Sequence, residues 1–538
     1  MTVIAPYQSQ VADTRDGFGQ LLRAEWTKFR TVRGWMITLL VTVLVMVGFG
    51  LLSAAGTTSS CAQDTSSGPG PARSGAGCLP TFPLGPGGEP VSDSFYLVHQ
   101  PLTGNGSITT RITSLTGLVQ PPNGSQGPGP GDTQPGVMPW SKAGVIIKQN
   151  LNQGSAYAAM MVTGGHGVRM QWNYTGDTAG LPGTVSANSP RWLRLTRSGD
   201  VITGYDSANG TNWTQVGTVT LSGLPSTVQV GLFGASPDYT SVVQNFGGGT
   251  SSKGGGPTQV TGVFDRVTLS GGSAAGPWAS GYVGADNGSG IGGYHQAGGQ
   301  FTVTGSGDIA PIAEGHGGPA DAALTIHDYL LGTFAGLIAL AVIAAMFMTA
   351  EYRRNLIRVT LAASPRRGRV LAAKAIVVAA VSFVAGLVGA ALAVAVGTAV
   401  THSRGYWEFP VSGPVEARVI VGTGLLAAVT AVLALAIGTI VRRSAATVAI
   451  VIVTIVLPYF LAVASVVPLG VADWLLRVTP AAGFAVQGAY PEYGQVTAIY
   501  SALSGYYPLG ALAGLGLLCA WTAVALAWAA VLLRRRDA

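Results

Sequence analysis

The side chains best suited to chemistry in this chain are four aromatic residues in a Gly- and Thr-rich region. These are Trp172, Trp192, Tyr205 and Trp213. Aromatic rings combine a large apolar face with a polar edge, so the four are candidates for stacking on a sugar ring. The alternative is that alternate members simply fill the core of a β-sheet domain, and the sequence leaves both interpretations open.

The cysteines, acids and histidines point to structural roles. Cys61 and Cys78 lie in one Gly/Pro-rich stretch, without Cys-x-x-Cys spacing, and we expect them to form a disulfide rather than a metal site. No Asp-x-Asp-x-Asp loop is present, so calcium binding by Asp200, Asp206 or Asp265 is less favoured than turn or surface roles. The six histidines are scattered and do not pair with a serine or cysteine nucleophile. We therefore expect no catalytic residues, no metal and no enzyme activity.

Long apolar runs dominate the rest of the chain. Each is near the roughly 20 residues that span a bilayer as a helix, the state in which backbone polar groups are satisfied inside hydrocarbon. The runs are Trp35–Leu52, Tyr329–Ala350, Ala375–Val400, Val419–Val441, Ala445–Val467 and Leu509–Leu533. The predicted fold is an α-helical, polytopic membrane domain of six spans.

Basic residues set the predicted orientation. Clusters precede the first span, separate the second from the third and the fourth from the fifth, and follow the sixth, so all fall on one side. The positive-inside rule makes that side cytoplasmic, with both termini inside a plasma membrane and residues 56–325 outside. The net charge of +7 then reflects topology, and nucleic acid is not an expected partner. A cleaved signal peptide is disfavoured, because more than thirty residues precede the first run.

The insert between the first two runs has the pattern of an all-β unit. Its apolar residues alternate in short runs, and Asn209-Gly210 indicates a hairpin. The eight predicted strands are 143–147, 156–162, 168–172, 192–197, 201–206, 214–219, 227–233 and 262–269. Such spacing favours a two-sheet sandwich, and we interpret the low-complexity stretches 56–90 and 271–299 as linkers or irregular coil. The run from Trp192 to Thr214, a W-x-R-L strand followed by a hairpin with Gly-x-x-Trp, resembles concanavalin-like, laminin-G-type jelly rolls.

One charged segment precedes the first span, and a second one lies between the second and third spans. Residues 21–33 combine spaced apolar side chains with cations, which predicts a helix lying in the cytoplasmic interface and touching lipid headgroups. Its candidate residues are Arg23, Glu25, Trp26, Lys28 and Arg30. Glu351 ends the second span, where an acid does not help positive-inside orientation, so we expect it to have a specific partner, Arg354 or a residue of another subunit.

These segments together resemble the type-two ABC exporter permeases, especially actinobacterial ones. The matching elements are R-x-E-W-x-K-x-R-T before the first span, E-Y-R after the second, and T-L-x-x-x-P-R-R-x-x-x-L-x-x-K leading into the third. The resemblance covers residues 21–52 and 329–538, and the β insert departs from the minimal family plan. It implies coupling to a separate ATPase subunit through the boundary residues Glu351, Tyr352, Arg353, Arg354, Arg358, Pro365, Arg366 and Arg367.

The sequence therefore predicts a cytoplasmic region 1–33, a first span in 34–55, an external sandwich in 56–325, and spans two to six in 326–538 with a coupling loop 351–374. Gly-x-x-x-x-Gly-Lys-Ser/Thr is absent, so ATP and Mg²⁺ would bind a partner ATPase. The function expected from the resemblance is a homodimeric exporter permease for a hydrophobic or amphipathic solute. The alternatives are an anchored glycan-binding receptor or envelope assembly factor and, third, an importer.

Overall fold

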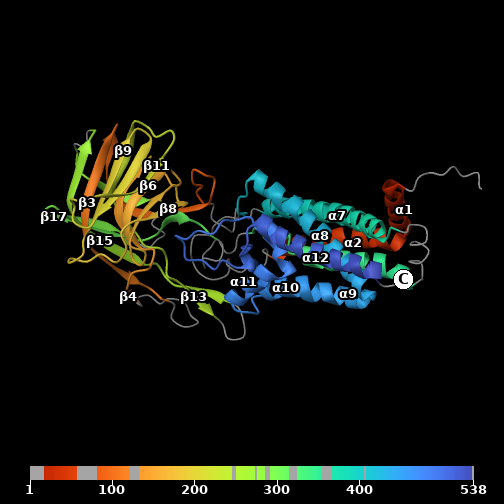
Figure 1. The fold of residues 1–538 in the computed structure, drawn as a ribbon. Coiled ribbons are helices and arrows are strands. Elements are labelled where there is room, and N and C mark those ends of the chain that lie inside the picture. Colours follow the sequence, from red (N-terminus) through yellow and green to blue (C-terminus); the bar gives the residue numbers. More distant parts are fainter. Residues whose placement is uncertain are drawn as a thin grey trace, which may run out of the picture.

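The structure is a computed structural model that describes residues 17–56, 82–121, 133–244, 250–272, 276–284, 291–313, 324–353, 366–404 and 407–535. A β-rich part and an elongated helical bundle lie end to end (Figure 1). Helix α1 (Phe18–Thr31) and the carboxyl-terminal end of the chain lie at the end of the bundle far from the strands (Figure 1). Cys61 and Cys78 fall outside the described residues, so their predicted disulfide stays a prediction.

Six helical segments are long and apolar enough to cross a membrane, one for each apolar run of the sequence. They are α2 (Arg33–Gly56), α4 with α5 (Ile326–Tyr329 and Thr333–Arg353), α7 (Arg367–Ser403), α8 (Gly413–Val441), α9 with η3 and α10 (Ser444–Val451, Ile452–Val456 and Leu457–Val463), and α12 (Ala511–Arg535). The predicted helical part is thereby confirmed by length and composition. The third helix begins eight residues before the predicted run and so includes Lys374.

Pro458 lies in the second half of the fifth segment, and a proline inside a helix favours a kink. A π-helical stretch, η3, ends two residues before this proline. Proline has no N–H to donate, and a wider π turn is one way a helix continues past the missing bond.

Between the fifth and sixth segments the chain turns back on itself. Helix α11 (Leu469–Val478) and the 3-10 helix η4 (Pro480–Gln487) are bent by 103° relative to one another, and a third short helix, η5 (Ala502–Ser504), follows. All eight residues of η4 are buried, and η4 packs against α8 and α12. This bent pair has the shape expected for a re-entrant or interfacial segment.

The β-rich part is a sandwich of two large antiparallel sheets. Its strands are β1 (Val91–Asp93), β2 (Phe95–Thr103), β3 (Gly106–Val119), β4 (Gln134–Pro135), β5 (Lys142–Lys148), β6 (Tyr157–Thr163), β7 (Val168–Trp172), β8 (Gly176–Ala179), β9 (Arg191–Ser198), β10 (Val201–Ser207), β11 (Thr214–Thr220), β12 (Thr227–Ala235), β13 (Thr240–Gln244), β14 (Thr250–Gly254), β15 (Gln259–Gly271), β16 (Ala279–Val283), β17 (Gly293–Ala297), β18 (Gln300–Gly305) and β19 (Ile309–Pro311). One sheet has the order β11-β10-β9-β3-β15-β18-β17, with β4 beside β3, and the other β16-β2-β12-β5-β6-β7-β8. A core of aliphatic side chains such as Val145, Leu193 and Ile202 fills the space between them.

All eight predicted strands are present, but the interpretation of 271–299 as linker or coil was wrong. This stretch contains β16 and β17, each at the edge of a different sheet. Both strands are largely exposed and lack the alternating burial of the central strands, so apolar alternation does not mark them in the sequence.

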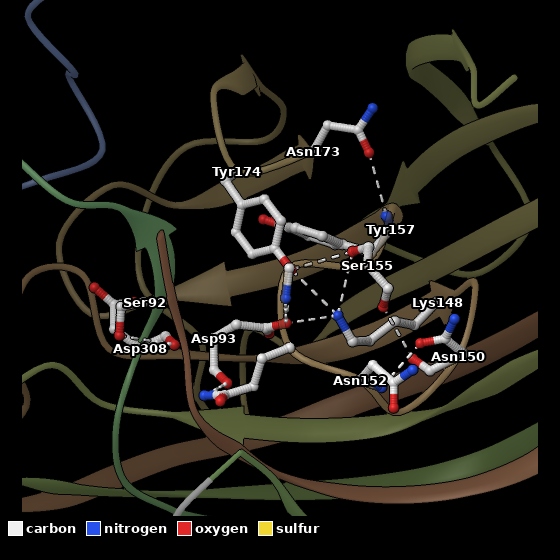
Figure 2. A network of polar contacts seen from close by, with 12 residues as sticks. Ser92, Asp93, Lys148, Asn150, Asn152, Ser155, Tyr157, Asn173, Tyr174 and Asp308 are labelled. Atoms are coloured by element: carbon white, nitrogen blue, oxygen red, sulfur yellow. Dashed lines mark hydrogen bonds and ion pairs between the residues drawn. The ribbon is translucent and has the colours of Figure 1, made fainter. Parts of the chain in front are cut away.

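The two ends of the insert form a ribbon that covers the seven-stranded sheet on the side away from the main core. Strands β1 and β19 pair with one another and pack against residues such as Phe95, Tyr157 and Phe233. Figure 2 shows the polar network beneath the ribbon, in which Lys148 and Tyr174 both point at the carboxylate of Asp93. The side chains of Lys148 and Asp93 are fully buried, and this ion pair joins β1 of the ribbon to β5 of the seven-stranded sheet.

Candidate functional site

Helix α1 carries an apolar stripe that packs against the bundle. Phe29 is 1% exposed, and its ring centroid lies 5.5 Å from that of Trp35 and 5.7 Å from that of Phe347. Leu21 and Leu22 pack against the same core, whereas Trp26 is 43% exposed. A helix is therefore present where the sequence predicts one, with Leu22 and Phe29 facing the protein and Trp26 on the outer side, and its contact with lipid stays a prediction.

A cluster of four charges joins α1 to two other helices. The ammonium of Lys374, near the start of α7, donates to Glu25 Oε2 at 2.8 Å and to Glu351 Oε1 at 2.6 Å. Lys28 Nζ donates to the second oxygen of Glu25 at 2.9 Å and to Glu351 Oε1 at 3.2 Å. Two acids and two cations from α1, α5 and α7 thus balance one another; we call Glu25, Lys28, Glu351 and Lys374 the charge cluster.

Most of the charge cluster is shielded from solvent. The side chains of Lys374 and Glu25 are each 1% exposed, that of Glu351 is 9% exposed, and only Lys28 reaches the surface, at 44%. Burial alone would lower the pKa of Lys28, but the hydrogen bonds and negative charges of Glu25 and Glu351 outweigh it and raise that pKa above 10.5. Lys374 Nζ also lies 4.5 Å from the ring centroid of Phe347. Burying such charges is tolerable only when each is paired, so the cluster fixes how α1 sits on α5 and α7.

Four of the other predicted coupling residues have described positions. Tyr352 lies beside Arg442, whose guanidinium carbon is 4.9 Å from the ring centroid, and Arg367 donates to the Leu533 carbonyl at 2.8 Å. Arg366 is the residue before α7, and Arg353 is the last residue of α5. Arg354, Arg358 and Pro365 lie outside the described residues. The described partners of Glu351 are Lys28 and Lys374, and its pairing with Arg354 stays a prediction because Arg354 is not described.

The remaining interface residues lie on the exposed side of α1. Arg23 and Arg30 are both exposed, and Arg23 and Lys28 line an open groove of about 570 Å³ along the helix. A second open hollow of about 560 Å³ is lined by Arg366, Arg367, Arg369 and Arg534. Cationic hollows beside the charge cluster make this end of the bundle suited to an acidic protein surface or to lipid headgroups.

The sequence placed Lys374 among the orienting cations and at the end of the third permease-like motif, but it did not predict that Lys374 pairs with Glu25 and Glu351. One signal was available: Glu25 lies four residues after Leu21 and four before Phe29, which places a carboxylate in the middle of the apolar stripe of α1. An acid at such a position needs a buried cation.

The four aromatic candidates do not form one platform. Trp192 and Tyr205 lie on β9 and β10 of the eight-stranded sheet, and Trp213 lies between β10 and β11. Trp172 is on the other sheet and packs against the core of the sandwich. Asp200 and Asp206 accept backbone N–H groups of Gly223 and Leu181, and Asp265 pairs with Arg111.

The comparisons with known proteins leave the family open. No family model matches the chain, and no curated protein matches it. Among solved structures, scytalido-glutamic peptidase with a transition-state-analogue inhibitor is similar over 41% of this chain and 100% of that chain, at 9% identity and a TM-score of 0.23. A functionally unknown protein from Saccharomyces cerevisiae is similar over 32% of this chain and 71% of that one, at 14% identity and a TM-score of 0.18.

Proposed function

We propose that this chain is the membrane-spanning permease subunit of an ABC exporter. The observation that carries the proposal is the charge cluster, in which Glu25, Glu351 and Lys374 come from the three short motifs that resemble type-two exporter permeases. The first motif lies far from the other two in the chain, yet the charged residues of all three are partners in a buried site. A cluster built from all three argues that they act as a unit.

In this proposal the cluster transmits force from a separate ATPase. The subunit would dock near residues 351–374 and the exposed side of α1. Because α1, α5 and α7 are held together by paired charges, a push on α1 would move the ends of the second and third spans with it. The chain lies in the plasma membrane as a homodimer, with α1 and both termini inside and the sandwich outside.

The solute that fits this membrane part is hydrophobic or amphipathic. Between Ala375 and Val400, and in the five other apolar runs of the sequence, no Asp, Glu, Lys, Arg or His occurs. Ion-coupled carriers place such groups at membrane depth. Energy from a separate ATPase therefore suits the composition better, and the outward direction rests on the resemblance.

The test is co-expression with any P-loop ATPase found to be encoded beside this gene, followed by purification through a tag on this chain and measurement of ATP hydrolysis in lipid. Glu351→Gln should weaken co-purification and stimulated hydrolysis, since it leaves a buried lysine short of one carboxylate. Arg443→Gln changes an exposed cation at the same end and serves as the matched control. Equal behaviour of the two variants, or no association with any ATPase, would remove the proposal.

The second candidate is a membrane-anchored receptor or envelope assembly factor acting through the sandwich. It is favoured by the cationic and aromatic side chains on the outer face of the eight-stranded sheet. A receptor without a transport role should bind its ligand equally well when Glu351 is changed and should recruit no ATPase.

A further inference from the structure

One face of the eight-stranded sheet looks away from the sandwich core and carries aromatic and cationic side chains in adjacent positions. On β9, Leu193 and Leu195 point into the core, whereas Trp192 and Arg194 alternate with them on the outer face. The pairing register sets Arg111 of β3 opposite Trp192, and Tyr205 of β10 opposite Arg194. Directly opposed residues on one face lie within contact distance of each other.

A bulge in β15 adds a further cation to this face. The register between β15 and β3 shifts between Asp265 and Thr268, and Arg266 has a φ of +50°. A bulge redirects a side chain, and the left-handed region is unfavourable for a residue with a long side chain. Arg266 is exposed, and its guanidinium carbon lies 5.6 Å from the ring centroid of Trp192.

The aromatic rings hold the guanidinium groups in place. The guanidinium carbon of Arg194 lies 3.9 Å from the ring centroid of Trp213, and its Nε donates to Thr109 at 3.0 Å. Stacking fixes a guanidinium flat while leaving its other N–H groups available at the edge. Gly210, at φ +78°, lets the loop before Trp213 lie against Trp192, because a Cβ there would come within 2.6 Å of that ring.

The charge of this face is positive. Arg111 forms an ion pair with Asp265, its Nε lying 2.7 Å from Oδ1. Across the described part of the chain, no ion pair is found for Arg194 or Arg266. Two cations without an ion-pair partner thus lie among partly exposed aromatic rings. A ligand that matches both features carries an anionic oxygen group on a unit that can pack flat against an aromatic ring.

We propose that this surface, the arginine–tryptophan face formed by Arg111, Trp192, Arg194, Tyr205, Trp213 and Arg266, binds a polysaccharide whose sugar rings carry carboxylates. The apolar side of a pyranose ring packs against Tyr205 and Trp192, and the sugar carboxylate accepts from the guanidinium edges of Arg194 and Arg266. A neutral sugar would leave both cations unpaired. An acidic peptide would supply the charge but no ring to lie on the aromatic side chains. This inference does not depend on the transport proposal.

Binding is measured on the full chain in lipid nanodiscs, with polygalacturonate as the probe, dextran as the neutral polymer and polyglutamate as the charged polymer without sugar rings. We expect polygalacturonate to bind at least about tenfold more tightly than either of the other polymers. We also expect its affinity to fall as salt is added. Equal affinity for polyglutamate would mean that the face recognises only negative charge, and it would overturn the proposal. Equal affinity for dextran would also overturn it.

Two substitutions locate the site. Arg194→Gln and Arg266→Gln should each weaken polygalacturonate binding about tenfold, the effect expected from losing a charge-assisted hydrogen bond. Arg404→Gln, an exposed cation at the end of α7, is the matched control and should bind as the parent does. Arg266 is exposed on a bulge, so its replacement leaves the core intact; unchanged binding in both variants would place any polyanion site elsewhere and refute the inference.

Discussion

Replacing Lys374 with methionine tests the charge cluster directly. The change keeps a long apolar stem but removes the ammonium that lies 2.8 Å from Glu25 and 2.6 Å from Glu351. Two buried carboxylates are then left with Lys28 alone. Removing one partner from a buried pair costs about 3–5 kcal/mol, and since Lys28 is partly exposed and can adjust, we expect the lower end, about 3 kcal/mol.

That amount decides whether α1 stays docked. Burial of Phe29 contributes roughly 2–3 kcal/mol, so the loss is as large as the main apolar anchor of the helix. We therefore expect local release of α1 and not unfolding of the bundle. Amide hydrogen exchange in lipid nanodiscs measures this: peptides from 18–31 should exchange about 100-fold faster in Lys374→Met, whereas those from the sandwich should not change.

Two further variants separate charge from packing. Glu25→Gln combined with Lys374→Met removes one charge of each sign and should restore part of the protection, because the remaining Lys28 and Glu351 balance. Arg443→Met, an exposed cation at the same end, should leave α1 unchanged. If exchange of 18–31 in Lys374→Met stays within about threefold of the parent, the cluster does not hold the helix and the reasoning fails.

Three other predictions concern the outer part and the topology. Lys148→Met leaves the buried Asp93 carboxylate without its cation and should destabilise the sandwich by about 3 kcal/mol, seen as a lower Tm that Asp93→Asn partly restores. Burial, followed by the charge of Arg169, lowers the pKa of His166 below 6.5 against the opposing charge of Asp177, and the ring stacks on Trp140 at 3.9 Å. Below pH 6.5 the unfolded chain therefore takes up a proton that the folded chain does not, so Tm should fall between pH 7.5 and 5.5 and fall less in His166→Gln. In a background without the three native cysteines, Ser198→Cys should react with a membrane-impermeant maleimide on intact cells and Arg443→Cys should not; the reverse pattern would contradict the proposed orientation.

Hydropathy and alternation predict most elements of this chain because each is a local rule. A run such as Val419–Val441 satisfies its backbone only as a helix in hydrocarbon, and a run such as Trp192–Arg197 buries every second residue. The rules fail where few side chains are buried. Strands β16 and β17 are short edge strands, and pairing with a neighbouring strand rather than apolar alternation holds them in place.

The candidate site was predictable only in part, because its contacts are long-range. Glu351 stood out as an acid where orientation would favour none, but its partner Lys374 is 23 residues away and Glu25 lies 349 residues from Lys374. Which cation reaches which acid depends on how α1, α5 and α7 pack. Likewise, the sequence left open whether Trp192 faces the core or the outside, and only the register with β3 and the bulge in β15 place Arg111 and Arg266 beside it.

Helix α7 connects the two ends of the helical bundle. Its 37 residues span about 55 Å, with Lys374 near one end and Thr401, hydrogen-bonded to Tyr329 at 2.8 Å, near the other. The sandwich is also attached to the helical part, since Gln495, in the segment after the bent pair α11–η4, donates to the Tyr174 carbonyl at 2.9 Å. Arg418 of α8 holds the end of that pair by donating to the Gly488 carbonyl at 2.6 Å.

A displacement of α1 therefore has a continuous path of packed and hydrogen-bonded elements to the sandwich, through α7, α8 and the bent pair. Gln495→Ala removes one link of this path without touching the charge cluster. Under the permease proposal, this variant should keep its ATPase partner while the exchange of sandwich amides no longer responds to nucleotide. If the sandwich of the parent chain is itself insensitive to nucleotide, the two ends work independently, and the sandwich is then a passive attachment to the bundle.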